Sequence, residues 1–489
     1  MGISQADSNI KTTLSPPEWH WYSFPRRYVV AVLAFFGFFN IYSLRVNLSI
    51  AIVAMTENHT VIYENGTISQ VQEFNWNSNQ QGLLLASFFY GYIITQLPGG
   101  WLAPRMGAAK LYGLGILSTA ILTVLTPVIA TSGLAPLIAV RVLEGILEGV
   151  TFPAMHALWS QWAPPLERSK LVTAAYSGNY FGTVISMVVC GLLAEHLGWP
   201  SIFYVFGGFA LLWCILWFVF VKESPAEDRF ISKEELDYIT SCLGTSSNHH
   251  KSVPWKAILT SLPVWSTVVA HFAENWGFYT MLTQLPTFLN DVSHFKLDKT
   301  GFLAAIPYLA MAIVVQCGGQ LADLLRSKWK TSTTLVRKLF TCGAFIAQTI
   351  FMLATAYTHT VVGAVVCLTI AVGFGGFAWS GFSVNHLDIA PQYASLLMGI
   401  SNTVATLPGI VSPSITGYIV QTKSASEWHI VFYIAAGIYL FGCVFYGIFA
   451  SGDRQSWAMD SEEKEPDNNM TDISLTVDSV VSYGTTKQD

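Results

Sequence analysis

The chain has 489 residues, of which 52% are hydrophobic and only 11% are charged. Soluble domains carry about 25% charged residues, so this composition excludes an ordinary soluble protein and indicates one that crosses a membrane repeatedly. The formal net charge of −5 says nothing about partners, which in a membrane protein are read from the positions of the charges. We expect a lipid bilayer around the chain and no nucleic-acid partner.

Apolar runs of about 20 residues, long enough to cross a bilayer as helices, recur along the chain. The first run lacks a small-residue cleavage site, so it is a membrane span and not a signal peptide. The predicted spans cover residues 28–53, 80–102, 109–130, 134–158, 170–194, 201–221, 262–290, 300–322, 334–357, 360–382, 394–420 and 429–451. The predicted fold class is an all-α membrane protein with twelve transmembrane helices.

The polar segment 222–261 divides the spans six and six. We predict a cytoplasmic tail (1–27), a six-helix bundle (28–221), a cytoplasmic linker (222–261), a second six-helix bundle (262–451) and a disordered cytoplasmic tail (452–489). In the linker, Ser232 and Glu235 have the spacing of a capping box, which predicts the start of a short helix.

Lysine and arginine are concentrated in alternate connections and absent from loop 55–79. This asymmetry predicts that both termini are cytoplasmic and that loop 55–79 is lumenal or external. That loop contains two glycosylation sequons, at Asn58 and Asn65, on the predicted side. Another sequon, at Asn469, lies in the cytoplasmic tail and should stay unmodified.

The fourth span contains Arg141, Glu144 and Glu148. An ionisable side chain at membrane depth costs about 3 kcal/mol even on lenient scales, so it needs a partner or water. The spacing i, i+3, i+7 places all three on one helix face, which must point into the bundle. One arginine needs one partner, so the second carboxylate is available for a proton or a ligand. A structural ion pair that fixes helix packing is the alternative.

Arg45 lies inside the first span with no acidic residue nearby in sequence. We expect it to bind an anion together with Arg141, with pairing to Glu148 or Glu144 as the alternative. Two guanidinium groups suit a carboxylate, which each can hold bidentately, and they suit phosphate about as well. Tyr90, in the second span, is a further candidate for substrate contact.

Glu144 and Glu148 are the candidates for proton coupling. A carboxylate that pairs with Arg141 when substrate is absent would gain a proton when substrate takes over the arginine. His156 lies two turns beyond Glu148, where it is expected to relay protons or to form a structural hydrogen bond.

Glu274 lies in the seventh span, the counterpart of the first, and its role stays open between a cation or proton site, a gate pair with Arg45 and a structural role. Asp388, at the end of the tenth span, is predicted to be a cytoplasmic gate residue. Asp323 and Arg326 are predicted to form an inter-helix clamp. No metal site is expected.

The two halves of the chain share sequence features at corresponding positions. Gly99–Gly100 follows the second span as Gly318–Gly319 follows the eighth, and Trp199 opens the sixth span as Trp428 opens the twelfth. Matching signals in matching spans predict two six-helix pseudo-repeats, the architecture of major facilitator transporters.

Five motifs spread along the spans carry a family resemblance. They are Arg45-Val-Asn47-Leu48, the run from Ser87 to Gly100, Gly149-Val-Thr-Phe-Pro153-Ala-Met-His156, Trp162-Ala-Pro-Pro165-Leu-Glu-Arg168-Ser169 and Asn385-His386-Leu-Asp388-Ile-Ala-Pro391. Together they resemble solute carrier family 17. The loop motif 100–107 departs from the superfamily pattern, with Pro104 where its usual Asp stands.

Within that family the chain is most similar to the sialin branch, which shares Arg141, Glu144 and Glu148. The vesicular glutamate transporters have Gln in place of Glu144 and Arg in place of Glu274, whereas the sialin branch has an uncharged residue at the second position. Glu274 is thus an extra carboxylate in this chain, which leaves the substrate open.

The resemblance implies a proton-coupled secondary active transporter with alternating access that moves organic anions of the acidic sugar (sialic acid) or acidic amino acid class across a lysosomal or vesicular membrane. The alternative is a sodium-dependent phosphate or anion cotransporter at the plasma membrane. A receptor or channel fits the duplicated halves less well, and no nucleotide loop or catalytic triad predicts an enzyme. We expect H⁺ as the coupling ion (alternatively Na⁺), no cofactor, a small anionic solute as ligand and a monomer.

Overall fold

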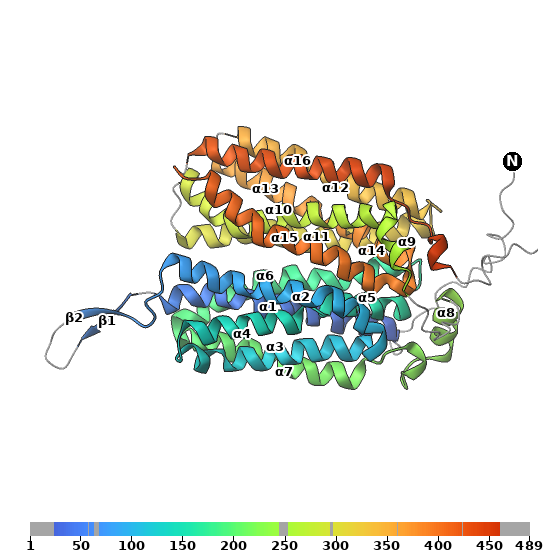
Figure 1. Cartoon of the computed structure of the whole chain (residues 1–489), viewed down its shortest axis with the longest axis horizontal. Helices are drawn as coiled ribbons and strands as arrows, with labels where there is room; N and C mark the ends of the chain where they lie inside the picture. The colour runs from blue at the N-terminus through green and yellow to red at the C-terminus, as the bar shows by residue number, and fades with distance from the viewer. Residues whose placement is uncertain are drawn as a thin grey trace, which may run out of the picture.

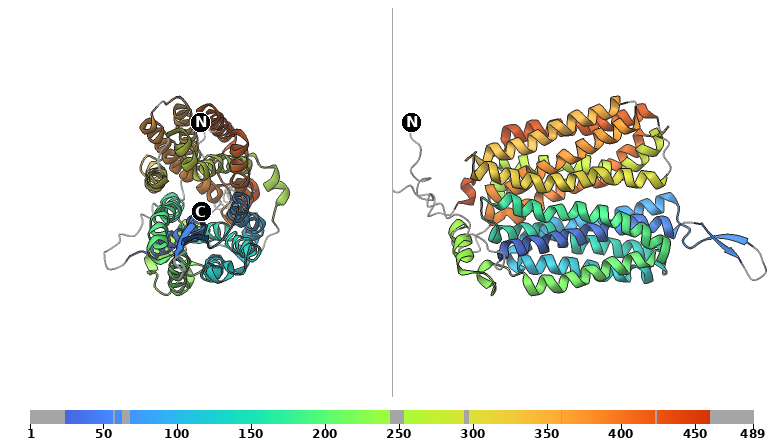
Figure 2. Two further views of the ribbon diagram at one scale, coloured as in Figure 1. Left: turned by 90° about the vertical axis from the view of Figure 1, so that its left-hand side faces the viewer. Right: turned by 180° about the vertical axis from the view of Figure 1, so that it is seen from behind.

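The computed structural model describes residues 24–56, 58–62, 68–243, 253–293, 297–358, 360–422 and 424–459. Long helices run side by side in two bundles (Figures 1 and 2). The first bundle contains α1 (Arg26–Met55), α2 (Ser78–Met106), α3 (Ala108–Ala130), α4 (Leu134–Glu148), α5 (Thr151–Trp162), α6 (Arg168–Leu197) and α7 (Pro200–Phe220).

The second bundle follows the linker helices α8 (Lys233–Leu243) and α9 (Trp255–Thr260). It contains α10 (Leu262–Ser293), α11 (Leu297–Ser327), α12 (Thr333–Tyr357), α13 (Val361–Ala378), the π-helical turn η3 (Trp379–Ser383), α14 (Val384–Ile389), α15 (Ala394–Ile419) and α16 (Ala425–Phe449). When α4 with α5, and α13 with η3 and α14, count as one crossing each, the predicted twelve crossings are all present.

Nine stretches of the described chain are long and apolar enough to span a membrane on their own. The crossings outside that set are α2, α10 and the pair α4–α5. The helix α4 has only 15 residues, and α2 and α10 contain several Asn and Gln residues. The least apolar crossings are therefore held in the membrane by packing against their neighbours.

Loop 55–79 contains an element that the sequence did not predict. Strands β1 (Asn58–Ile62) and β2 (Ile68–Gln72) form an antiparallel hairpin in which Asn58 pairs with Gln72. The hairpin projects from one end of the bundles, and α8 lies at the opposite end (Figure 1). We refer to these as the hairpin end and the α8 end.

The fourth crossing is broken directly after Glu148. Pro153 has no N–H group to donate to the carbonyl of Gly149, four residues earlier, so the helix loses one backbone hydrogen bond at this turn. The hydroxyl of Thr151 donates to the carbonyl of Glu148, at 2.7 Å. The break therefore places Glu148 at the end of a helix, in the interior of the bundle, where it is 1% exposed.

The two bundles meet mainly through α2 against α15, α5 against α15, and α6 against α11. Glycines permit the closest approaches. A methyl group at Gly100 would lie 2.5 Å from the carbonyl oxygen of Ser395, and one at Gly319 would lie 2.8 Å from that of Ser169. The two Gly-Gly pairs thus have matching positions: each lets the second crossing of its half touch the fifth crossing of the other.

We expect glycans on Asn58 and Asn65 and none on Asn469. Asn58 begins β1, at the hairpin end, whereas Asn65 and Asn469 lie outside the described residues. Glycosidase-induced mobility shifts of single Asn→Gln variants measure this. Removal of either loop site should reduce the shift, and a glycan on Asn469 would contradict the predicted orientation.

Candidate functional site

The predicted ion cluster forms at the contact between α1, α2 and α4. Gly145 and Gly149 are four residues apart and lie on the face of α4 that contacts α2. Because they have no side chains, α4 and α2 can approach closely. A methyl group at Gly145 would lie 2.1 Å from the carbonyl oxygen of Phe88, and one at Gly149 would lie 2.3 Å from the hydroxyl of Thr95. The same face of α4 then carries its ionisable side chains into the bundle.

Arg45 reaches across from α1 to Glu148. Its Nη2 donates to Oε1 of that carboxylate at 2.5 Å, so the residue takes the pairing that the sequence left as an alternative. The rings of Tyr42, Phe88 and Tyr92 lie between 4.7 and 4.8 Å from its guanidinium carbon. Aromatic faces attract a cation, so this cage and the carboxylate together stabilise the buried charge.

Arg141 forms a second pair beside the first. Its Nη1 donates to Oε2 of Glu144 at 2.7 Å, and Thr123 donates to the other oxygen of that carboxylate at 3.2 Å. Its Nη2 lies 3.4 Å from the carbonyl oxygen of Arg45, and its guanidinium carbon lies 5.5 Å from the centre of the Phe88 ring. The two arginines are therefore neighbours, each with its own glutamate.

Both pairs keep unused hydrogen-bonding capacity. The Nε atoms of Arg45 and Arg141 and the Oε2 atom of Glu148 are buried and have no hydrogen-bond partner in the described residues. A guanidinium group offers five donors, so an anion could bind between the arginines without displacing every existing contact.

Tyr90, the candidate for substrate contact on α2, does not lie in this cluster. It is 45% exposed on α2, on the same stripe as Leu83, Ile94 and Trp101, which face away from the bundle. Tyr92 takes the inward place, above Arg45. Phe88, Tyr92 and Gln96 repeat every four residues, and this spacing could have identified the inward face from the sequence.

His156 lies at the contact between the two bundles. Its Nε2 is 3.2 Å from the carbonyl oxygen of Ser383, and its Nδ1 is 2.8 Å from the hydroxyl of Tyr176. A carbonyl can only accept, so Nε2 carries the proton in a neutral ring and Tyr176 donates to Nδ1. His156 therefore forms hydrogen bonds with Ser383 and Tyr176 and with neither glutamate of α4. This arrangement fits the structural hydrogen bond that the sequence offered as an alternative to a proton relay.

Asp388 joins the two bundles at the α8 end. It accepts from Nη1 of Arg168 in the first bundle at 3.2 Å and from Nε of Arg337 in the second at 2.7 Å. Arg337 is 0% exposed and also donates to Ser169 and to the carbonyl of Ser380. The sequence did not identify Arg337 as a site residue; it lies within α12, inside the predicted span 334–357, and is a central member of this junction.

Asp323 and Arg326 strengthen the same junction. The Asp323 carboxylate accepts from the backbone N–H groups of Ser169 and Lys170, at the start of α6, where the helix dipole favours a negative charge. Arg326 donates to the carbonyl of Pro165 at 2.5 Å. Nearer mid-membrane, Asn402 donates to Tyr92 and Gln96. These contacts close the α8 end of the interface between the bundles.

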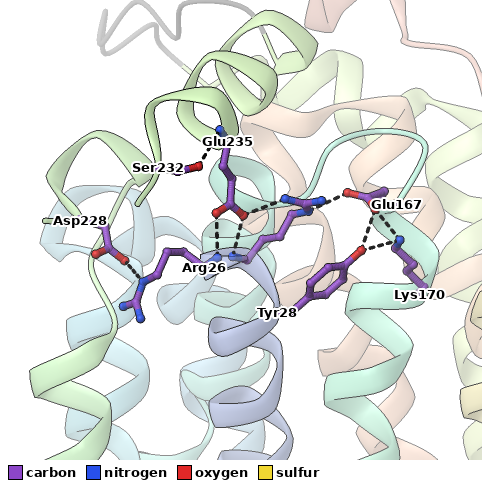
Figure 3. A network of polar contacts seen from close by, with 8 residues as sticks. Arg26, Tyr28, Glu167, Lys170, Asp228, Ser232 and Glu235 are labelled. Atoms are coloured by element: carbon purple, nitrogen blue, oxygen red, sulfur yellow. Dashed lines mark hydrogen bonds and ion pairs between the residues drawn. The ribbon is translucent and has the colours of Figure 1, made fainter. Parts of the chain in front are cut away.

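A second polar network fixes the linker to the first bundle (Figure 3). Glu235 of α8 accepts from the backbone N–H groups of Arg26 and Arg27, at 2.8 and 3.2 Å, and so caps the start of α1. Its own backbone N–H donates to Oγ of Ser232 at 3.1 Å, as the predicted capping box requires, but its side chain binds the start of α1 instead of completing the box. Asp228 holds the side chain of Arg26 at 2.8 Å.

Glu167 connects this network to the start of α6. It binds Arg27 at 2.7 Å and also accepts from Tyr28 and Lys170. Burial disfavours the ionised carboxylate, but the hydrogen bond from Lys170 and the charge of Arg27 outweigh burial and hold the pKa of Glu167 below its usual value. Because Lys170 also binds Asp323 through its backbone, the linker network and the junction at Asp388 are continuous.

The fold and the buried ion pairs at the contact of its helices define a membrane transporter of the major facilitator type. The Major Facilitator Superfamily model matches residues 29–413. Two solved transporters share the fold: the proton:xylose symporter XylE (TM-score 0.66, 15% identity, 88% of this chain and 97% of that one) and the E. coli fucose:proton symporter FucP (TM-score 0.60, 15% identity, 87% and 99%).

Relatives with similar sequences show which family within the superfamily the chain belongs to. Human sialin is 47% identical over 449 residues, which cover 88% of this chain and 91% of sialin. Vesicular glutamate transporter 2 from Bos taurus is 45% identical over 481 residues, which cover 95% of this chain and 82% of that transporter. The chain belongs to the major facilitator superfamily and, within it, to the sialin and vesicular glutamate transporter family, solute carrier family 17. It is a transporter and not an enzyme.

We predict that Glu167→Gln destabilises the protein by about 3 kcal/mol at pH 7, the usual loss when one partner of a buried ion pair is removed. A carboxyl with a lowered folded pKa stabilises the fold above its ordinary pKa of 4.5, and this contribution is lost as the pH falls through the lower folded value. Thermal unfolding of the detergent-solubilised protein should therefore show a steeper loss below about pH 5 for wild type than for the variant.

The exposed Glu227, also in the linker, provides the matched control, because Glu227→Gln should leave the unfolding temperature unchanged. Equal pH dependence of wild type and Glu167→Gln would show that Glu167 does not stabilise the linker network.

Proposed function

We propose that the protein is a secondary active transporter of organic anions, of the acidic sugar or acidic amino acid class, and that protons drive it by alternating access. The observation that carries the proposal is the pair of buried arginines, Arg45 and Arg141, each neutralised by a glutamate of α4. The names of its relatives, sialin and vesicular glutamate transporter 2, support an anionic substrate.

In this proposal the glutamates act as internal substitutes for the substrate. Without substrate, Glu144 and Glu148 neutralise the arginines, and separating a buried pair costs about 3 to 5 kcal/mol. An incoming carboxylate takes over a guanidinium group with equivalent hydrogen bonds. The displaced glutamate then loses its counter-charge and takes a proton, because a lone buried carboxylate is unstable. Anion and proton therefore enter the site together.

The junction at the α8 end supplies the second requirement, a barrier on one side. Arg168, Arg337 and Asp388 hold the bundles together there, and the positive-inside pattern makes this side cytoplasmic in our proposal. The conformation described would then receive substrate from the hairpin side. Rocking of the bundles would break the junction and open the cytoplasmic side.

This orientation suits export from a lysosome or vesicle, whose acidic lumen would supply both anion and protons. A sodium-dependent phosphate or anion cotransporter at the plasma membrane is the second candidate, since two arginines bind phosphate as readily as a carboxylate. Purified protein in liposomes, tested with imposed proton or sodium gradients and with sialic acid, glutamate or phosphate as solute, separates the two. Accumulation that follows sodium alone would replace the proton-coupled proposal.

We predict that Arg141→Lys lowers transport by about tenfold or more, although the charge is kept. A lysine ammonium can hold Glu144 but cannot also present a planar fork to a carboxylate substrate. Initial uptake into liposomes by equal amounts of folded protein measures the effect, with Arg229→Lys, in an exposed part of the linker, as control. Uptake near the wild-type rate would show that Arg141 is only a structural counter-ion.

We predict that Glu144→Gln separates substrate movement from the proton gradient. The variant keeps the shape of the side chain and removes its titration, so exchange of substrate should persist. Accumulation should fall about tenfold per unit of pH gradient, because one proton fewer enters each cycle. Counterflow and pH-driven uptake are measured side by side in liposomes.

Glu148→Gln is the second variant of this pair, and the exposed Glu195→Gln of α6 is the control. If both Glu144→Gln and Glu148→Gln accumulate substrate with undiminished pH dependence, neither glutamate of α4 carries the coupled proton.

A further inference from the structure

The second bundle contains a buried carboxylate that, unlike the glutamates of α4, forms no ion pair with a described arginine. Glu274 of α10 is 1% exposed and lies twelve residues from the start of that helix at Leu262, about 18 Å along its axis and near the centre of a bilayer. Its Oε2 atom has no hydrogen-bond partner, and no lysine, arginine or histidine of the described chain forms an ion pair with it.

The Glu274 carboxylate packs against a glycine and polar side chains of neighbouring helices. A methyl group at Gly375 of α13 would lie 2.3 Å from Oε1 of Glu274 and 2.8 Å from Nε2 of Gln348. The Gln348 amide donates to the hydroxyl of Tyr439 at 3.1 Å, and its Oε1 atom is buried without a partner among the described residues. Four crossings, α10, α12, α13 and α16, therefore converge on a polar cluster in which the described residues place one carboxylate and no cation.

The described side chains of the helices packed around this cluster bring no positive charge to it. Helices α13 and α15 contain no Asp, Glu, Lys or Arg. The nearest cations of α12, Arg337 and Lys338, precede Gln348 by ten residues or more, about 15 Å along the helix. On α10 itself, His271 directs Nδ1 to the hydroxyl of Ser401 at 3.1 Å.

The remaining ionisable groups of the neighbouring helices are phenols close to this cluster or groups near the ends of the crossings. The phenols are Tyr308 of α11 and Tyr439 of α16, with Tyr180 of α6 across the interface. The groups near helix ends are Asp291 of α10, Asp298, Lys299, Asp323 and Arg326 of α11, Glu427 and His429 of α16 and His386 of α14. Among those whose side chains the structure describes, none forms an ion pair with Glu274.

An ionised carboxylate in such surroundings would be strongly destabilised, because no cation of the described residues compensates its charge. A proton removes the charge and provides a donor, and the unpartnered oxygen of Gln348 is an acceptor of the matching kind. We propose that Glu274 is a second proton-binding site of this transporter, loaded while the glutamates of α4 are held by arginines. Its part in coupling rests on the function proposed above.

Proton binding at Glu274 has a different requirement from proton binding at the glutamates of the first bundle. Glu144 and Glu148 accept a proton only after an arginine has left them, whereas Glu274 has no partner to release. Protons can therefore bind in the second bundle before substrate enters the first. The two bundles would then contribute separately to the proton count of one cycle.

Infrared difference spectroscopy of the full-length protein in lipid tests the protonation directly. A protonated carboxylic acid has a carbonyl stretching band that an ionised glutamate lacks. In sodium-free buffer at pH 7, wild type minus Glu274→Gln should show this band, and its absence would overturn the proposal. Loss of the band when sodium replaces choline would assign the site to sodium instead.

Transport in liposomes tests the coupling. Glu274→Gln should retain exchange and lose about tenfold in accumulation per unit of pH gradient, and the double variant with Glu144→Gln should lose about a hundredfold, since each change removes one proton. An infrared band with unchanged accumulation would show a protonated residue outside the transport cycle and overturn this part.

The two experiments fail independently. If wild type shows no pH-driven uptake of any anion, the proposed function fails while the infrared band still decides the protonation of Glu274. Should Glu274→Gln not fold, Glu274→Met, which replaces the carboxylate with an apolar chain of similar length, supplies the difference spectrum.

Discussion

The cost of a charge at membrane depth is the constraint on which the rest of this structure depends. Arg45 and Arg141 are each neutralised by a glutamate of α4, and Arg337 by Asp388. The pairs of Arg45 and Arg337 connect two helices, and the pair of Arg141 lies within α4. Ion pairing therefore neutralises buried charges and also holds helices together. Glu274 stands outside this pattern, and for that reason a proton is the natural compensation for its charge.

Close backbone approach brings together the helices that surround the ion pairs. Gly145 lets α4 pack directly on α2, whose Phe88 and Tyr92 rings lie beside the guanidinium group of Arg45. Gly100 and Gly319 allow similar close contacts between the bundles, at positions related by the internal duplication. The glycines therefore set how closely the helices around the charged groups approach one another.

The sequence predicted the crossings and the ionisable members of the site well, because hydropathy and helical spacing are local properties. It failed where a side chain chooses among distant partners. Tyr90 and Tyr92 differ only in helix face, Arg337 of α12 binds Asp388 of α14, and Glu235 binds the start of α1 instead of completing its own capping box. The hairpin in loop 55–79 was missed because its strands are short and their residues mostly polar.

The π-helical turn at Trp379–Ser383 has a consequence for how the closed end is released. A π turn carries one residue more than an α turn, and it frees carbonyl groups from the helix ladder. Here the carbonyl of Ser380 receives Arg337 and that of Ser383 receives His156. If this segment changed to α-helical register by one residue, both carbonyl acceptors would move. One local change of helix geometry would then release the hydrogen bond from Arg337 of the second bundle and the one from His156 of the first.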